Sequence, residues 1–128
     1  MFEKLKEYHK NSYVPISHFP VSACVVTTDG NEYFGVNVED ASTRAGTCAE
    51  RAAIFSAISA GKKQGDFKEL HVLTSSKKVG TPCFVCRQMI YEMFSKDSKV
   101  ICYSLEGERQ EFTVEELCPY PFGEEDLQ

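Results

Sequence analysis

The sequence contains no tryptophan, no excess of basic residues and no long run of apolar residues. Its N-terminal segment alternates charged with apolar side chains, so we expect neither a signal peptide nor a membrane span. The 14 basic and 19 acidic residues give a net charge of -5, which argues against the broad basic surface of a nucleic-acid-binding protein. We therefore expect a cytoplasmic protein whose partner is a small molecule.

Internal repeats, low-complexity tracts and interdomain linkers are also absent, which predicts a single domain over 1–128. Hydrophobic residues make up 42% of the chain and charged residues 26%, a composition typical of globular proteins. Nine phenylalanines and six tyrosines are available to fill a core.

The chain has six cysteines, and without a signal for an oxidising compartment we expect them to stay reduced. Three lie in apolar or proline-flanked segments, where a free cysteine packs as a small hydrophobic residue: Cys24, Cys102 and Cys118. The other three, Cys48, Cys83 and Cys86, are candidates for chemistry.

The pattern of apolar residues predicts helices near 2–11, 49–60 and 82–94 and a short one after Thr113, and strands at 21–28, 32–38, 70–74, 100–105 and 109–112. Asp29-Gly30 is typical of a hairpin turn between the first two strands. Thr113 and Glu116 have the spacing of a capping box. Helices that alternate with apolar strands predict an α/β fold, with a mixed sheet of about five strands covered by helices.

The remaining cysteines fall in two strings at predicted helix starts, Thr47-Cys48-Ala49-Glu50-Arg51 and Thr81-Pro82-Cys83-Phe84-Val85-Cys86, and Thr47 and Thr81 are the expected caps. Unpaired N–H groups and the helix dipole favour thiolates there. Cys83 and Cys86 share a helix face, whereas Cys48 and Glu50 can reach one ion only where a helix begins, which predicts Cys48 in the first turn. Three protein ligands would leave a fourth zinc position open for water, as in catalytic sites.

Each feature has a simpler interpretation when taken alone. Glu50 could complete a capping box with Thr47. Cys83 and Cys86 could form a redox pair or half of a structural zinc site, although a second C-x-x-C is missing. Arg51 is by default a solvated charge. Their combination favours a catalytic zinc site in which Glu50 is a proton carrier.

The combined pattern, Cys-Ala-Glu-Arg followed by Pro-Cys-x-x-Cys-Arg, resembles the short cytidine deaminases that hold zinc with three cysteines, and the resemblance covers nearly the whole chain. It implies a three-layer α-β-α cytidine deaminase-like fold and a homotetramer with active sites shared between subunits. It also implies zinc-dependent hydrolytic deamination of cytidine and deoxycytidine to uridine and deoxyuridine with release of ammonia, a reaction of pyrimidine salvage. By that resemblance Cys48, Cys83 and Cys86 bind Zn²⁺, and Glu50 moves protons from the attacking water to the base and the departing amine.

The resemblance implies further site residues. Arg51 would hydrogen-bond the ligand sulfurs, and Ala49 would present backbone groups to the base. Asn37 and Glu39, which share a strand face in Asn37-Val38-Glu39, would bind the ribose hydroxyls, and the carboxylate would repel a 3'-phosphate. This favours a free pyrimidine nucleoside over a polynucleotide.

Two aromatic residues complete the expected site. Phe19 matches the family's aromatic before the first strand and would line the pocket, although a role as plain core is equally open. Phe122, in Pro121-Phe122-Gly123, resembles the aromatic that the family lends to a neighbouring subunit.

Some positions depart from the family pattern and leave substrate scope open. Thr43 stands where an aromatic is common, Ser22 replaces a usual glycine, and Phe84-Val85 replaces a small pair. The nearest alternative is a deaminase of an aminonucleoside such as blasticidin S, although Asn37 favours cytidine. A noncatalytic zinc-binding module and a thiol redox module are alternatives from other classes, but neither explains Glu50 and Arg51 beside Cys48.

Overall fold

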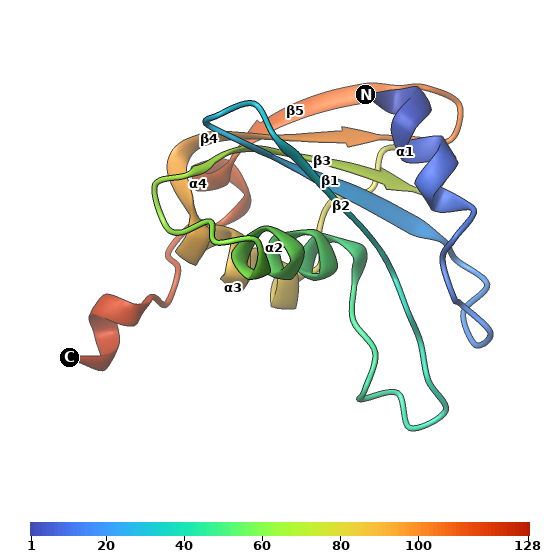
Figure 1. Ribbon diagram of the computed structural model, residues 1–128, viewed down its shortest axis with the longest axis horizontal. Helices are drawn as coiled ribbons and strands as arrows, with labels where there is room; N and C mark the ends of the chain where they lie inside the picture. The colour runs from blue at the N-terminus through green and yellow to red at the C-terminus, as the bar shows by residue number, and fades with distance from the viewer.

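The computed structural model describes residues 1–128 and contains one five-stranded sheet with helices on both faces (Figure 1). The strands are β1 (Val21–Thr27), β2 (Glu32–Val36), β3 (Phe67–Thr74), β4 (Phe94–Tyr103) and β5 (Arg109–Thr113). The helices are α1 (Phe2–His9), α2 (Ala49–Ser59), α3 (Phe84–Met93) and α4 (Val114–Leu117), followed by a 3-10 turn (Glu124–Leu127). In the order β2-β1-β3-β4-β5 only β3 and β4 run parallel, which confirms the predicted mixed sheet.

The two faces of the sheet carry separate cores, because successive residues of a strand point to opposite sides. Ala23 and Val25 of β1 join the larger core, which α2, α3 and α4 cover. Cys24 between them faces the other side and joins the smaller core under Leu5 of α1. This confirms the three-layer arrangement, with one helix on one face and three on the other (Figure 1).

Helix α2 lies directly against β2 at Gly35. A Cβ atom at this position would lie 2.4 Å from the Ala53 amide nitrogen and 2.7 Å from the Ala49 carbonyl oxygen, far inside contact distance. Only glycine allows this approach. The approach fixes the start of α2 relative to the sheet, and that start carries part of the candidate site.

Strand β4 begins earlier than the sequence pattern predicts. It starts at Phe94, directly after the last residue of α3, and Phe94 pairs with Phe67 at the start of β3. The two rings meet edge to face at 5.2 Å. The exposed polar residues that follow Phe94 hide this strand from a pattern based on apolar runs.

The predicted capping box at the start of α4 is confirmed. The Thr113 hydroxyl accepts from the Glu116 amide at 3.1 Å, and the Glu116 carboxylate accepts from the Thr113 amide at 2.8 Å. All six cysteines are free, and Cys24 and Cys102 are fully buried, as expected of packing residues. None of the helices has the length and apolar composition required to cross a bilayer.

Candidate active site

Three cysteine sulfurs meet where α2 and α3 begin. Cys48 immediately precedes α2, Cys83 immediately precedes α3, and Cys86 lies in the first turn of α3. Their sulfur atoms all lie within 4.8 Å of one another, and those of Cys48 and Cys83 are 3.9 Å apart. Two helix N-termini therefore direct their unpaired amides and positive dipole ends towards one group of thiols.

The cysteines themselves, rather than Thr47 and Thr81, occupy the cap positions. Cys48 and Cys83 have extended backbone conformations, with ψ of 156° and 163°, and neither helix has a side-chain cap hydrogen bond. The expectation of threonine caps was wrong by one residue at α2 and by two at α3, and Pro82 stands before its helix instead of at the first helical position. Two of the three clustered cysteines thus stand where a capping residue would.

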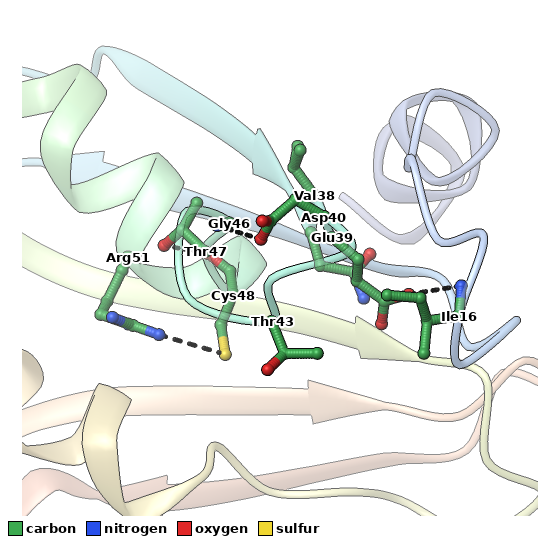
Figure 2. A pocket seen from close by; sticks show the side chains of 10 residues that line it. Ile16, Val38, Glu39, Asp40, Thr43, Gly46, Thr47, Cys48 and Arg51 are labelled. Carbon is green, nitrogen blue, oxygen red and sulfur yellow. Dashed lines mark hydrogen bonds between the residues drawn. The ribbon is translucent and has the colours of Figure 1, made fainter.

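Arg51 and the neighbouring thiols stabilise a thiolate at Cys48. The Arg51 Nη2 donates to the Cys48 sulfur at 3.5 Å, as the dashed line in Figure 2 marks. Hydrogen bonding by Cys86, followed by that of Arg51 and Cys83, lowers the pKa of the Cys48 thiol to about 5. The same interactions raise the pKa of Arg51, which stays charged.

The donor set fits Zn²⁺. Sulfur is a soft ligand that suits zinc, and a site with three protein ligands keeps the fourth coordination position for a water or a substrate. The buried Nε of Arg51 has no hydrogen-bond partner, so the guanidinium retains one donor beside this anionic group. Cys48, Cys83 and Cys86 are the residues that would hold the ion.

Glu50 is the second residue of α2 and is only 5% exposed. Burial, reinforced by the negative charge of Cys48, raises the pKa of its carboxyl group to about 7. No capping hydrogen bond forms at this helix start, so the interpretation of Glu50 as half of a capping box with Thr47 is wrong. A carboxyl group in this state accepts and returns a proton near neutral pH.

A cavity of about 270 Å³ opens beside the thiol group (Figure 2). Cys48 and Arg51 lie at one end, Ile16 and Glu39 lie at the other, and Thr43 lies between them (Figure 2). Asn37 also belongs to the lining. The volume is slightly below the roughly 300–1,000 Å³ of common small-molecule pockets. It has room for one small polar ligand.

The middle of the loop between β2 and α2, residues 40–46, also shapes this cavity, and there the sequence analysis noted only that Thr43 departs from the family pattern. The carboxylate of Asp40 accepts from the amides of Ala45 and Gly46 at 3.0 and 3.1 Å. Thr43 has a φ of 61°, a left-handed conformation that is costly for a β-branched residue. An aspartate followed by small polar residues is typical of such a turn, but the pattern does not reveal which side chain faces the cavity.

Asn37 and Glu39 lie in the cavity wall and also bind the segment that precedes β1. The Asn37 side chain accepts from the Val21 amide at 2.8 Å and donates to the Phe19 carbonyl at 2.9 Å. The Glu39 carboxylate accepts from the amides of Ile16 and Ser17 at 3.1 and 2.9 Å. Hydrogen bonding by the Ser17 side chain, followed by that of the Ser17 and Ile16 amides, lowers the pKa of Glu39 below its ordinary value.

The other predicted contact residues do not line this cavity. Phe19 is 39% exposed and is not among the lining residues. Ile16, three residues before it, lines the cavity. Ala49 is fully buried and is the first residue of α2, directly after Cys48 of the thiol group. Phe122 is 58% exposed and lies in the C-terminal segment, where its carbonyl accepts from Gln88 Nε2 at 2.7 Å. The roles predicted for these three residues stay predictions.

Arg87 is a supporting residue that sequence reasoning missed. Its guanidinium donates to the Pro82 carbonyl at 2.7 Å, the Leu117 carbonyl at 2.8 Å and the Thr81 hydroxyl at 2.9 Å. It also lies over the Phe84 ring at 4.3 Å. These contacts join the turn before Cys83 to the end of α4, and the position of Arg87 after the second cysteine string gave no indication of such distant acceptors.

Comparisons with known proteins agree with this geometry. Residues 1–104 match the family model described as the cytidine and deoxycytidylate deaminase zinc-binding region. The chain is 40% identical over 118 residues to a cytidine deaminase of Halalkalibacterium halodurans, covering 92% of this chain and 88% of that protein. It is 38% identical over 122 residues to one of Sporosarcina psychrophila, covering 95% and 88%.

Solved structures give the same result for the fold. The crystal structure of a cytidine deaminase from Burkholderia pseudomallei superposes with a TM-score of 0.90 at 35% sequence identity, covering 94% of each chain. The crystal structure of a cytidine deaminase from Mycobacterium tuberculosis superposes with a TM-score of 0.79 at 26% identity, covering 94% of this chain and 93% of that one.

Proposed function

The chain belongs to the family of cytidine and deoxycytidylate deaminases, and we propose that it catalyses the zinc-dependent hydrolytic deamination of cytidine and deoxycytidine. The products are uridine and deoxyuridine, with release of ammonia. The observation that carries the proposal is the group of three thiols at two helix starts, with buried Glu50 two residues after Cys48.

Zn²⁺, when bound, would supply the Lewis acidity that makes a water molecule nucleophilic near neutral pH. Cys48, Cys83 and Cys86 would hold the ion through their sulfurs. Because three thiolates leave the site negative, Arg51 and the two helix N-termini offset part of that charge.

Glu50 moves the protons. Its carboxylate takes one proton from the attacking water and gives it to the ring nitrogen beside the attacked carbon, as hydroxide adds to that carbon. It then takes the second proton from the added hydroxyl and gives it to the amine, which leaves as ammonia while the carbon–oxygen bond becomes the carbonyl of uridine. Burial supports this role, because a carboxyl group shielded from solvent exchanges its proton with the substrate instead of with bulk water. Ala49 lies at the same helix start and would present backbone groups to the base.

A free nucleoside suits the cavity better than a nucleotide or a polynucleotide. The Glu39 carboxylate in the cavity wall would repel a phosphate, and the net charge of -5 opposes binding to nucleic acid. We place the reaction in pyrimidine salvage in the cytoplasm on the family resemblance.

We further propose a homotetramer in which a neighbouring chain completes each site. The cavity of one chain has no aromatic residue in its wall, although aromatic faces are common partners of nucleobases. Phe122 is 58% exposed and does not line the cavity of its own chain, which suits a contribution to a neighbour.

A substrate panel tests the proposal. Zinc-loaded protein is incubated with cytidine, deoxycytidine, cytosine, cytidine monophosphate and blasticidin S, and ammonia release is measured for each. We expect turnover of the two nucleosides and little of the others. Zinc-loaded protein that leaves both nucleosides intact would refute the proposed function. Turnover of blasticidin S alone would show that the protein is an aminonucleoside deaminase instead.

A further inference from the structure

The chain after α4 carries Phe122 on a segment that neither core holds. No residue after Cys118 belongs to either hydrophobic core. The segment runs from α4 to the periphery of the molecule and ends away from the sheet (Figure 1). The Phe122 side chain is 58% exposed, and that of Tyr120 is fully exposed. Core packing therefore does not place the Phe122 ring, and polar contacts must do so.

A single hydrogen bond joins residues 119–122 to the rest of the chain. Gln88 Nε2 donates to the Phe122 carbonyl at 2.7 Å, and no other group of these four residues takes part in a hydrogen bond. The nearest backbone group that a side chain fixes before them is the Leu117 carbonyl, which accepts from Arg87 at 2.8 Å. The backbone of Phe122 is therefore fixed from Gln88 alone.

Two further hydrogen bonds hold the segment beyond Phe122, and both end on carboxylates. The Tyr91 hydroxyl donates to the Glu125 carboxylate at 2.8 Å, and Gln64 Nε2 donates to the Glu124 carboxylate at 3.1 Å. Each of these bonds acts through a flexible glutamate side chain, so it restrains the backbone less directly than a bond to a backbone carbonyl does. They dock the end of the chain and leave the place of the Phe122 ring to Gln88.

The Gln88 amide is itself held in one orientation. Its nitrogen also donates to the Glu92 carboxylate at 3.2 Å, one turn further along α3. Both partners are acceptors, so the nitrogen and not the oxygen of the amide must face them. Gln88 lies two residues after Cys86, so α3 carries both a candidate zinc ligand of its own chain and the anchor of Phe122.

The backbone just before Phe122 requires such an anchor. Tyr120 has a φ of 54°, a left-handed conformation that is costly for a bulky residue. Pro119 and Pro121 on either side of it have no N–H group with which to hold the chain. A strained conformation persists only where its surroundings fix it, and the hydrogen bond from Gln88 is the first such contact after Tyr120.

Accepting the proposed function and its shared sites, we propose that Gln88 is a positioning residue, which fixes the backbone of Phe122 and so places the ring that completes the base pocket of a neighbouring chain. Gln88 does not line the cavity of its own chain. It acts through Phe122, whose aromatic face suits the pyrimidine base and carries no proton. The hydrogen bond therefore contributes to the binding of the nucleoside and not to the chemical step.

A double-variant cycle between Gln88 and Phe122 tests this role. The kcat and KM for cytidine are measured for wild type, Gln88→Ala, Phe122→Ala and the double variant. We expect Gln88→Ala to raise KM about fivefold and to keep kcat within about twofold, because one modest hydrogen bond is lost and the reacting groups are untouched. Adding Gln88→Ala to Phe122→Ala should not raise KM further. Additive effects, or a KM that neither single variant changes, would overturn the proposal.

A fluorescence measurement reports the placement of residue 122 and does not depend on activity. The chain has no tryptophan, so Phe122→Trp introduces a single probe at this position. Adding Gln88→Ala to this variant should lower the anisotropy of the probe and increase its quenching by acrylamide. An unchanged anisotropy and quenching constant would contradict a positioning role.

Two further variants separate the placement of Phe122 from the docking of the whole segment. Tyr91→Phe removes the hydrogen bond to Glu125 in the same segment and should change KM by less than about twofold. If it raises KM as much as Gln88→Ala does, general docking explains the effect and the proposal is wrong. Gln88→Glu keeps the shape of the side chain without its donor, so it serves if Gln88→Ala does not fold, and the same rise in KM is expected.

Light scattering at the assay concentration keeps the outcomes distinct. Gln88→Ala should assemble as wild type does, and its dissociation would overturn the proposal, because the hydrogen bond would then maintain the contact between chains. An active monomeric wild type would refute the shared sites and this proposal with them. Wild type inactive on both nucleosides would refute the proposed function, while the fluorescence result would still decide whether Gln88 places Phe122.

Discussion

Arg87 should stabilise the protein far more than an exposed arginine does. Its guanidinium makes three hydrogen bonds, two of them to backbone carbonyls of Pro82 and Leu117 that lie far apart in the sequence. Charge-assisted hydrogen bonds of this kind contribute about 1–2 kcal/mol each where they are partly buried, and contact with the Phe84 face adds about 0.5 kcal/mol. We expect Arg87→Ala to lower the free energy of unfolding by about 3 kcal/mol.

The assay is thermal unfolding of metal-loaded protein, followed by circular dichroism. For a domain of this size about 1 kcal/mol corresponds to roughly 3–5 °C, so Tm should fall by about 10 °C. Arg87→Lys should recover only a small part of the loss, because an ammonium group cannot serve three fixed acceptors as the planar guanidinium does. Chelator should also remove zinc faster from both variants, because the turn before Cys83 loses its support.

The matched control is Arg109→Ala. Arg109 makes one exposed ion pair, with Glu111 at 2.7 Å, and such pairs contribute little, so its removal should change Tm by at most about 2 °C. If Arg87→Ala lowers Tm no more than Arg109→Ala does, the reasoning about the Arg87 contacts is refuted.

Three other predictions follow from the packing and the site. Gly35→Ala should shift the urea midpoint strongly downward, by about 2–3 kcal/mol in unfolding free energy, because the new methyl group would meet the Ala53 amide; an unchanged midpoint would contradict the close approach of α2. Burial lowers the pKa of His71 and His9, so the unfolded chain binds more protons below about pH 6.5. Glu50, whose pKa is raised, contributes with the opposite sign over the same range, so the test is the difference between two variants. Between about pH 7.5 and 5.5 the urea midpoint of wild type should fall relative to that of His71→Gln, and parallel profiles would be inconsistent with a lowered pKa of His71. Chelation of zinc should lower the Tm of wild type but not of Cys48→Ala, since only the former binds the metal; equal shifts would argue against Cys48 as a ligand.

The fold was largely predictable because its signals are local. The β-branched, apolar run of β1, the capping box at Thr113 and the hairpin turn at Asp29-Gly30 each depend on residues close in sequence. The start of β4 was missed, since the pairing of Phe94 with Phe67 is a long-range contact among polar neighbours.

The grouping of Cys48, Cys83 and Cys86 at two helix starts was predictable for a similar reason. A sulfur two residues from a carboxylate can share a site with it only at a helix start, and the structure places Cys48 at that point. The exact cap residue was not predictable, because Thr47 and Cys48 are both compatible with the pattern and only backbone geometry distinguishes them.

The contacts of Asn37 and of Arg87 could not be read from the sequence. Asn37 bonds Phe19 and Val21, and Arg87 bonds Leu117, across chain separations that only the folded sheet and helices close. Residue type indicates which groups can donate or accept, but not which distant backbone group will lie opposite them.

The most direct measurement is the kcat of Glu50→Gln on cytidine, with the zinc content determined on the same samples. The matched control is Glu106→Gln, because Glu106 is an exposed glutamate outside the site. Wild type, Glu50→Gln and Glu106→Gln should each carry about one zinc per chain, because the three sulfurs remain in place. Only Glu50→Gln should lose turnover, by about 100- to 10,000-fold, since the amide cannot carry the proton. A zinc-loaded Glu50→Gln protein that turns over cytidine within tenfold of wild type would contradict the assignment of Glu50 and the mechanism built on it.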